Sequence, residues 1–481
     1  MVKPTYTLEI DTAGDGSWAT SVGANVHGDR LVKTDRGADG TALLLPPKAG
    51  AADVTLNNDA GHGAGAYSPG VLLAGRKMRL RATYSAVTYN LWAGALQTPK
   101  QAPSGAVPLV NVSGFGVLAS LVKAKASTAL YANVTVGVAI GYLLDAAGFT
   151  GTRSLDAGNT TLAWYWEDEA NALDALRRLL YAEGPGARIY EDGDGALVFK
   201  SRHARVTDAR STTSQAAFTL LTAPMISAPF EYDPGIEAVI NDAKIEVVTR
   251  EASALAAIWT LRTALVLAAG EVRTYVVRAS DGDPFTAALD PVLTTDYTAT
   301  AGSITATLSR TSGGNATLTV TAGASGASIA AGLQVRAQAV EVVARTTVKN
   351  TISAAASIAK YGTISWDQDQ RGEIAAVDAQ DAVNAIVAHH QAGIPRLVFS
   401  VRGDRDATAL VQVLAREIGD RVTVTHAGSG VAGDFFVERV QHEISAPSRH
   451  LTTFTCSAVP TGTPAALDGA TALDGGRVLW F

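Results

Sequence analysis

The sequence has little that would cross-link it covalently or carry it into a membrane. It contains one cysteine, Cys456, among 481 residues, which excludes a framework of disulfides within the chain. No stretch approaches the roughly 20 apolar residues of a membrane helix, and the N-terminus lacks the apolar core of a signal peptide. We therefore expect a soluble protein that is made in the cytoplasm, with no direct insertion into a membrane.

Positive charge is also scarce. The chain has 39 Lys and Arg against 45 Asp and Glu, a net charge of -6, which is not the balance of a protein that coats nucleic acid. Hydrophobic residues make up 47% of the chain, enough to build cores, and this excludes intrinsic disorder as the general state. At about 150 residues per domain, the length predicts about three domains.

Motifs that carry catalysis or bind metal are missing. The chain has no H-E-x-x-H and no G-x-S-x-G sequence. His389 and His390 are neighbours on an expected helix, so their side chains point about 100° apart and cannot hold one metal ion together. Cys456 lies in an expected strand, where a buried apolar role is typical. We predict no catalytic residue, no metal and no cofactor.

Three glycine- or aspartate-rich segments resemble ligand loops. Gly61–Gly65 lacks the full spacing of a phosphate loop and no helix follows it. Residues 192–195 and 367–372 begin like calcium loops, but Ala196 and Arg371 occupy the position of the third oxygen ligand. We therefore interpret all three segments as loops or turns.

A β-hairpin is the clearest pattern in the N-terminal region. Over residues 77–84 the apolar side chains alternate with Lys77, Arg79 and Arg81, and a partner strand is expected over residues 89–96. With Arg76, these residues form a basic cluster. A solvated face or a protein interface is the favoured interpretation, because the chain is acidic and no aromatic residues interleave; a nucleic-acid role is the alternative.

Helical spacing appears in four places. Helices are expected over residues 135–147, 168–183, 379–392 and 407–418, with Asp378 and Asp406 as N-caps of the last two. Asp168 and Glu169 are expected in the first turn of the second helix, where the helix dipole favours acids. A second hairpin is expected across residues 188–199, and further strands over residues 6–10, 53–57, 243–248, 421–426, 434–444 and 450–457.

Residues 256–346 differ in composition from the rest and are rich in Thr, Ala and Val. Six short strands are expected over residues 260–267, 271–277, 297–300, 303–309, 316–321 and 332–343. Their spacing predicts an all-β sandwich inserted into the host fold.

The C-terminus ends in an apolar group, Val478, Leu479, Trp480 and Phe481. Fraying is the usual behaviour of a terminus. The alternative is docking on a partner, since Trp and Phe are common interface anchors.

Several segments, taken in order, resemble the tail-tip or baseplate hub proteins (minor tail proteins) of long-tailed bacteriophages. The resemblance lies in a strand with Leu-x-Asn, a Ser-Pro loop, a basic strand and an aromatic-Gly segment, followed by a helix-hairpin unit and closing strands. These segments are 54–59, 67–70, 73–81, 91–94, 172–179, 191–199, 357–362, 419–425, 436–440 and 451–454.

The resemblance implies a β-rich α+β multidomain fold with two tube-like β-barrel hub domains, small α/β domains and the inserted β-sandwich. The division we expect is a first barrel at 1–100, an α/β helix-hairpin domain at 101–202, β segments returning to a second barrel at 203–255, the sandwich at 256–346, helices and closing strands at 347–460, and a tail at 461–481.

The resemblance also implies a function without catalysis. It predicts a homotrimeric ring at the virion tail tip that continues the tail tube and passes genomic DNA in transit. Its partners would be the distal tail protein, the tape measure protein and tail fibre or receptor-binding proteins. The alternatives are a tail-associated enzyme that degrades the cell wall, and a receptor-binding adhesin that uses residues 256–346.

Overall fold

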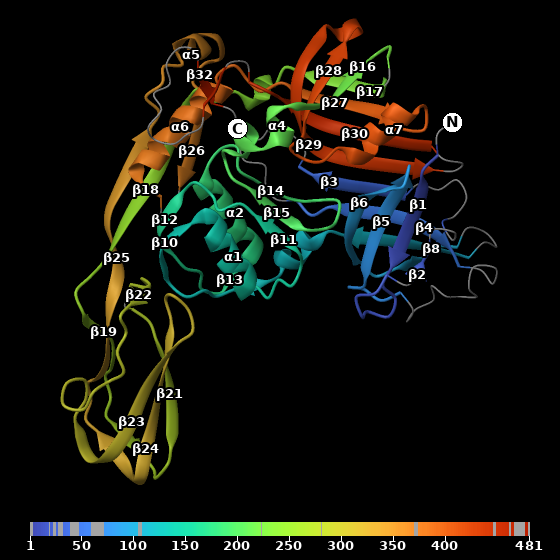
Figure 1. Cartoon of the computed structure of the whole chain (residues 1–481). Helices are drawn as coiled ribbons and strands as arrows, with labels where there is room; N and C mark the ends of the chain where they lie inside the picture. The colour runs from blue at the N-terminus through green and yellow to red at the C-terminus, as the bar shows by residue number, and fades with distance from the viewer. Residues whose placement is uncertain are drawn as a thin grey trace.

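The computed structural model describes residues 3–18, 20–22, 26, 32–38, 48–58, 72–103, 108–222, 224–279, 281–369, 374–445, 449–460, 463–465 and 477–479. Strands account for 49% of it and helices for 18%, so the fold is β-rich with helical additions, as predicted. Figure 1 shows a large sheet, an α/β unit beside it and an elongated β insertion that extends away from both. No helix within the described ranges is long and apolar enough to cross a membrane.

The largest sheet has 14 strands and joins the two ends of the chain. Its N-terminal strands are β1 (Thr5–Ile10), β2 (Thr20–Ser21), β3 (Val32–Gly37), β4 (Ala51–Asn57), β5 (Lys77–Tyr84), β6 (Val87–Leu96), β7 (Lys100–Gln101) and β8 (Leu109–Phe115). Its C-terminal strands are β16 (Ser214–Thr219), β17 (Ile226–Asp233), β27 (Arg396–Arg402), β28 (Arg421–His426), β29 (Val431–Ser445) and β30 (Arg449–Ala458).

The two expected barrels do not appear as closed barrels in the described residues. Their strands form one open sheet in the order β17-β27-β30-β29-β3-β4-β8-β6-β5-β1-β2. The ladder that joins the halves runs antiparallel from Val32 opposite Ile444 to Gly37 opposite Arg439. Because β3 uses its two edges for β4 and β29, it links the halves rather than closing either one.

The β5–β6 hairpin confirms the alternation predicted from the sequence. Ser85 and Ala86 connect the strands with φ angles of 49° and 65°, the left-handed values that two-residue hairpin turns use. The apolar side chains of β5 are buried, while Lys77 is exposed and Arg79 and Arg81 are half-buried on the other face. The hairpin therefore presents a basic face outside the core.

The α/β unit follows the first half of the sheet. It contains η3 (Val117–Val122), β9 (Lys125–Ala126), β10 (Tyr131–Thr135), α1 (Val136–Ala146), β11 (Arg153–Leu155), β12 (Thr161–Tyr165), β13 (Ala170–Asn171), α2 (Ala172–Glu183), β14 (Arg188–Glu191) and β15 (Leu197–Lys200). Short helices α3 (Ala204–Thr207) and α4 (Ala209–Thr212) lead back to the sheet.

The predicted start of the second helix was wrong. The helix begins after Asn171, which caps α2 because its side chain accepts hydrogen bonds from the amides of Leu173 and Asp174 at 3.1 Å each. Asp168 and Glu169 therefore lie before the helix, and Glu169 has a φ of 48°.

The insertion is built on one long strand. β25 (Leu333–Lys349) pairs with β18 (Asp242–Ala252) near the body and with β19 (Ala256–Leu261) farther out. The remaining strands are β20 (Leu265–Leu267), β21 (Val272–Val277), β22 (Phe285–Thr286), β23 (Ala299–Arg310) and β24 (Ala316–Ile329); η4 (Ile236–Ala238) precedes β18. Leu318, Val320 and Val335 belong to the insertion's own core.

Two strand limits in the insertion differ from prediction. Residues 260–267 form parts of two strands, because β19 pairs with β25 while β20 pairs with β24. Residues 297–300 and 303–309 instead contribute to the single strand β23, which continues through a register shift at Gly302, whose φ is 66°.

A tight turn of the insertion docks on the α/β unit. The amide of Gly313 donates to the carbonyl of Thr128 at 2.7 Å, and the Ser312 hydroxyl donates to Asp168 at 3.1 Å. A Cβ at Gly313 would lie 2.5 Å from Cβ of Trp166, so only glycine fits this approach. The insertion is thus held at its stem and at this turn.

The remaining helices are α5 (Ala355–Tyr361), α6 (Ala376–His390), α7 (Ala407–Ala415) and η5 (Ala427–Ser429), and β26 (Ser365–Asp369) pairs with β18. Asp406 caps α7 through the amide of Ala409 at 2.7 Å, as predicted, although α7 ends three residues earlier than expected. Asp378 is not the N-cap of α6; Ala375 is, and Asp378 lies in the first turn.

Candidate functional site

A groove separates the basic face of the β5–β6 hairpin from the α/β unit. Its volume is about 870 Å³, within the range of small-molecule sites. We call it the basic groove. Its lining includes Trp18, Lys77, Arg79, Arg81, Asn90, Ala93, Ala95, Phe115, Val117, Phe149 and Asp194.

One wall of the basic groove carries the predicted basic cluster. Arg79 Nε lies 2.6 Å from Glu9 Oε2, and Arg81 Nη2 lies 3.0 Å from Glu9 Oε1. The Arg79 guanidinium also stacks 4.2 Å from the ring centroid of Trp18. One buried carboxylate thus fixes two guanidinium groups, while Lys77 remains exposed at the rim.

The opposite wall is formed by η3, the segment after α1 and the turn between β14 and β15. Asp192 Oδ1 accepts hydrogen bonds from the amides of Asp194 at 3.0 Å and Ala196 at 2.8 Å. These bonds confirm the turn predicted at residues 192–195 and use the carboxylate that a calcium ion would need. Asn90 on β6 donates to Asp194 and joins the two walls.

A buried carboxylate connects the α/β unit to the sheet below the groove. Glu191 is 2% exposed, and it accepts hydrogen bonds from the amides of Gly50 at 2.7 Å and Leu118 at 2.6 Å. Burial raises the pKa of its carboxyl group to about 7, although these bonds favour the ionised form. This carboxylate thus joins three segments that are far apart in sequence.

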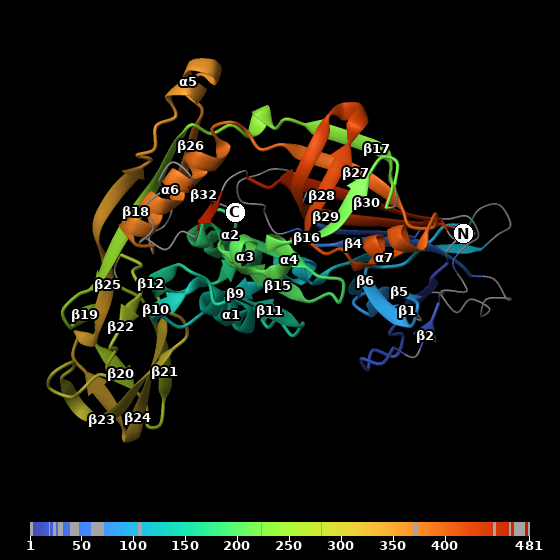
Figure 2. The ribbon, with the colours of Figure 1, turned by 45° about the horizontal axis from the view of Figure 1, so that its top comes forward.

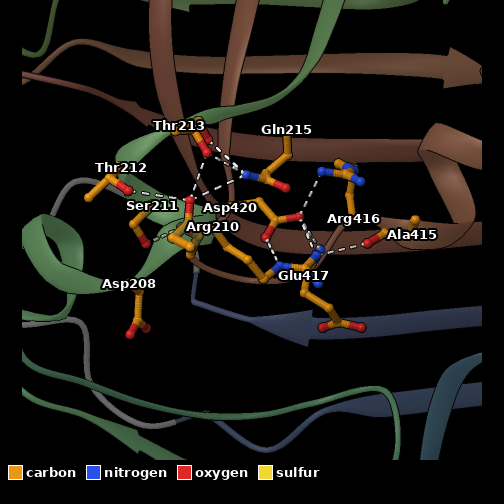
Figure 3. A network of polar contacts seen from close by, with 12 residues as sticks. Asp208, Arg210, Ser211, Thr212, Thr213, Gln215, Ala415, Arg416, Glu417 and Asp420 are labelled. Carbon is orange, nitrogen blue, oxygen red and sulfur yellow. Dashed lines mark hydrogen bonds and ion pairs between the residues drawn. The ribbon is translucent and has the colours of Figure 1, made fainter.

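Figure 3 shows a second ionic junction, between α4 and the approach to β28. Arg210 forms two hydrogen bonds with Asp420, at 2.5 and 2.7 Å, and Arg416 lies 3.2 Å from the same carboxylate. The Ser211 hydroxyl donates to the carbonyl of Gly419 at 2.8 Å. These contacts fix the short helices against the C-terminal half of the sheet.

Sequence analysis missed a buried chain of polar groups in the sheet core. The Tyr6 hydroxyl lies 2.9 Å from His450 Nδ1, and His450 Nε2 lies 3.0 Å from His442 Nδ1. Burial lowers the pKa of His450 to about 4 and the pKa of His442 well below its ordinary value. No local spacing could reveal it, because 444 residues separate Tyr6 from His450.

Other histidines and the cysteine also have structural surroundings. His390 is 1% exposed, and its Nδ1 lies 2.9 Å from the carbonyl oxygen of Ala238. Cys456 is buried in β30, as predicted, and burial raises the pKa of its thiol. Within the described part of the chain, no group of three or more His, Cys, Asp or Glu side chains could hold a metal ion.

The remaining segments singled out in the sequence have mixed outcomes. Gly61–Gly65 lies outside the described residues. The prediction of a turn over residues 367–372 was wrong for its first three residues, because residues 367–369 continue β26 in a parallel ladder with β18. Asp367 forms an ion pair with Lys244 at 2.9 Å.

The structure describes two of the four C-terminal residues that were predicted to bind a partner. Val478 and Leu479 belong to β32 (Arg477–Leu479), which pairs in parallel with β31 (Thr463–Ala465). Trp480 and Phe481 lie outside the described residues. Partner binding by these four residues stays a prediction.

Solved structures with a similar fold include a tail protein. A tail protein from Neisseria meningitidis matches with a TM-score of 0.50 and 11% identity, over 94% of this chain and 96% of that one. The chain therefore has the fold of this tail protein.

Two further tail proteins are similar at lower scores. The 43 kDa tail protein of prophage MuSo2 from Shewanella oneidensis has a TM-score of 0.48 and 11% identity, over 95% of this chain and 96% of that one. Prophage tail protein gp18 from Listeria monocytogenes has a TM-score of 0.44 and 9% identity, over 94% of each chain. The sequence itself matches no protein-family model and no curated protein.

Proposed function

We propose that this chain is a structural hub of a phage-type tail tip. Three copies form a ring that continues the tail tube, with a central channel through which DNA passes. The observation that carries the proposal is the fold similarity to the Neisseria tail protein across nearly the whole of both chains. Its location would be the tail tip of a virion assembled in the bacterial cytoplasm.

The architecture supports an assembled rather than a solitary state. The 14-stranded sheet is open, β17 is the strand at one end of its order, and most side chains of β17 are exposed. An open edge of this kind offers unpaired backbone groups that a neighbouring chain can cover. Cyclic assembly covers such surfaces on every copy.

The charge of the chain suits a conduit. Lys and Arg contacts to phosphates add affinity for DNA, so a strongly basic wall would slow its passage. The net charge of -6 favours weak contact with DNA in transit. The distal tail protein, the tape measure protein and receptor-binding or fibre proteins are the partners that such a hub would contact.

We infer that the role is not enzymatic. The carboxylates of the buried junctions are used in ion pairs and in backbone hydrogen bonds, as at Asp420 and Glu191. A zymogram against the host cell wall provides the direct test. Lysis that disappears on replacing one acidic pair would overturn this part of the proposal.

The experiment for the ring is native mass spectrometry of the full chain, followed by negative-stain imaging. We expect a homotrimer and a three-lobed ring with a central hole. A monomer at micromolar concentration, together with absence of the chain from purified virions, would contradict the hub.

A second candidate function is receptor binding by the insertion. Its outer sheet face presents three cross-strand rows without a charged residue. These rows are Val276–Thr317–Ser309, Thr274–Thr319–Thr307 and Val272–Thr321–Thr305. Deleting residues 256–337 and measuring adsorption separately from particle assembly tests this role. An adhesin module is needed for adsorption but not for assembly, so only adsorption should fall.

A further inference from the structure

Two exposed surfaces of opposite charge lie toward opposite ends of the large sheet. The basic groove lies on β5 and β6, near one end of the strand order, and β17 is the strand at the other end. Figures 1 and 2 both show β17 and β5 toward opposite ends of the sheet, with β27, β30 and β29 between them. A contact that joins these two surfaces must therefore occur between different copies of the chain.

The basic groove carries a local excess of positive charge. Lys77, Arg79 and Arg81 line it together with one carboxylate, Asp194. A second carboxylate, Glu9, binds Arg79 and Arg81 from outside the lining. Glu9 carries one negative charge and is bound to both arginines, so it offsets only one of their two positive charges. Lys77 is exposed. This excess is local, because the whole chain is acidic.

The groove also has apolar walls. Trp18 and Phe149 are partly exposed in it, and Phe115 is 37% exposed at its end. A binding partner that supplies only charge would leave these side chains in water. The groove fits a surface that combines acidic residues with large apolar ones.

Such a surface follows the end strand of the sheet. Glu231, Asp233 and Glu237 are exposed on β17 and η4, and Tyr232 and Ile236 are 43% and 53% exposed. Glu231 and Asp233 point to one face of β17, whereas Tyr232 between them points to the other face. We call these five residues the acidic edge. Arg396, opposite Asp233 in the ladder with β27, offsets one of the three negative charges.

We propose that the acidic edge of one copy docks in the basic groove of the next copy in the trimer. This inference rests on the proposed function and names the contact that would build the ring. Because the two surfaces are different patches of the same chain, the interface is heterologous, and heterologous contacts close into rings when the rotation between copies allows it. Charge complementarity sets the register, and the apolar side chains supply the buried centre.

The test exchanges charges across the contact in the full chain. Lys77→Glu and Glu231→Lys are each expected to raise the dissociation constant of the trimer by roughly tenfold or more. Combining them restores a pair of opposite charges and is expected to bring the constant back to within about threefold of wild type. Arg79 and Arg81 are left unchanged because they hold Glu9.

Matched controls lie on β25, away from both surfaces. Lys349→Glu and Glu341→Lys reverse exposed charges of the same types and are expected to leave the trimer unchanged. Mixing Lys77→Cys chains with Glu231→Cys chains adds an independent readout. The only native cysteine is buried, so a disulfide-linked product is expected only in the mixture.

The outcomes separate this inference from the hub itself. A trimer that neither reversal weakens, with no cross-link in the mixture, overturns the proposed contact and leaves the hub in place. A trimer weakened by both reversals without recovery in the double variant also overturns the pairing. A wild-type chain that stays monomeric and is absent from purified virions removes the hub and the contact together.

Discussion

Arg36 and Glu417 form a doubly hydrogen-bonded ion pair between residues 381 positions apart in the chain. Arg36 Nη1 lies 2.7 Å from Glu417 Oε2, and Nη2 lies 3.1 Å from Oε1. Arg36 is 2% exposed, and its Nε also donates to the carbonyl of Leu91 at 2.8 Å. One side chain thus joins β3, β6 and the segment before β28.

Replacing Arg36 tests how much this junction stabilises the fold. Arg36→Met leaves Glu417 without its partner, and we expect a loss of about 3 kcal/mol in the free energy of unfolding. The carboxylate is 29% exposed, so water relieves part of the cost. Urea unfolding followed by tryptophan fluorescence measures this change in the free energy of unfolding.

The matched control removes an exposed pair on the same strand. Lys33 lies 3.0 Å from Glu443, with side chains 57% and 38% exposed, and Lys33→Met is expected to cost less than about 1 kcal/mol. Equal losses in the two variants would contradict the argument from burial.

Glu191 is expected to make stability depend on pH. Its pKa rises from 4.5 to about 7 on folding, so the folded state binds more protons between these values. Its contribution is fully present below pH 4.5 and is lost as pH rises through 7, by about 3 kcal/mol. Glu191→Gln should flatten this part of the profile in urea unfolding at stepped pH. If the difference in the free energy of unfolding between the variant and wild type is the same from pH 4.5 to 7, the assignment of this pH dependence to Glu191 is refuted.

The buried histidines are expected to act in the opposite direction. The pKa of His450 falls from 6.5 to about 4 on folding, so the unfolded chain binds more protons in this window. The contribution of neutral His450 to the free energy of unfolding is therefore full above pH 6.5. It is lost as the pH falls through 4, by about 3 kcal/mol. His450→Gln should reduce this slope. His426→Gln removes a partly exposed imidazole outside the buried chain, and an equal reduction there would contradict the assignment.

Docking of the insertion turn can be tested at two adjacent glycines. A methyl group at Gly313 would lie 2.5 Å from Trp166, whereas one at Gly314 meets no atom within 4 Å. We expect Gly313→Ala to open the contact and speed amide exchange at residues 311–315 roughly tenfold or more. Gly314→Ala should leave the exchange unchanged. Similar exchange in the two variants would mean that the turn does not hold the insertion.

Local patterns predicted most of the elements but not their ends. The alternation in β5 was sufficient to predict which side chains lie outside the core, and Asp406 was a correct N-cap. The start of α2 was missed because Asp168 and Glu169 look like first-turn acids, while Asn171 supplies the actual cap. The start of the 367–372 segment resembled a turn because of its two aspartates, but pairing with β18 outweighed that preference.

The sequence by itself determined the β-rich class and the positions of the hairpins, because side-chain periodicity and turn residues act over a few positions. Only the tertiary structure decided that the strands of both halves share one open sheet, that His442 and His450 meet Tyr6, and that Arg36 finds Glu417. These contacts depend on which strand edges pair across hundreds of residues, and no short-range pattern encodes that choice.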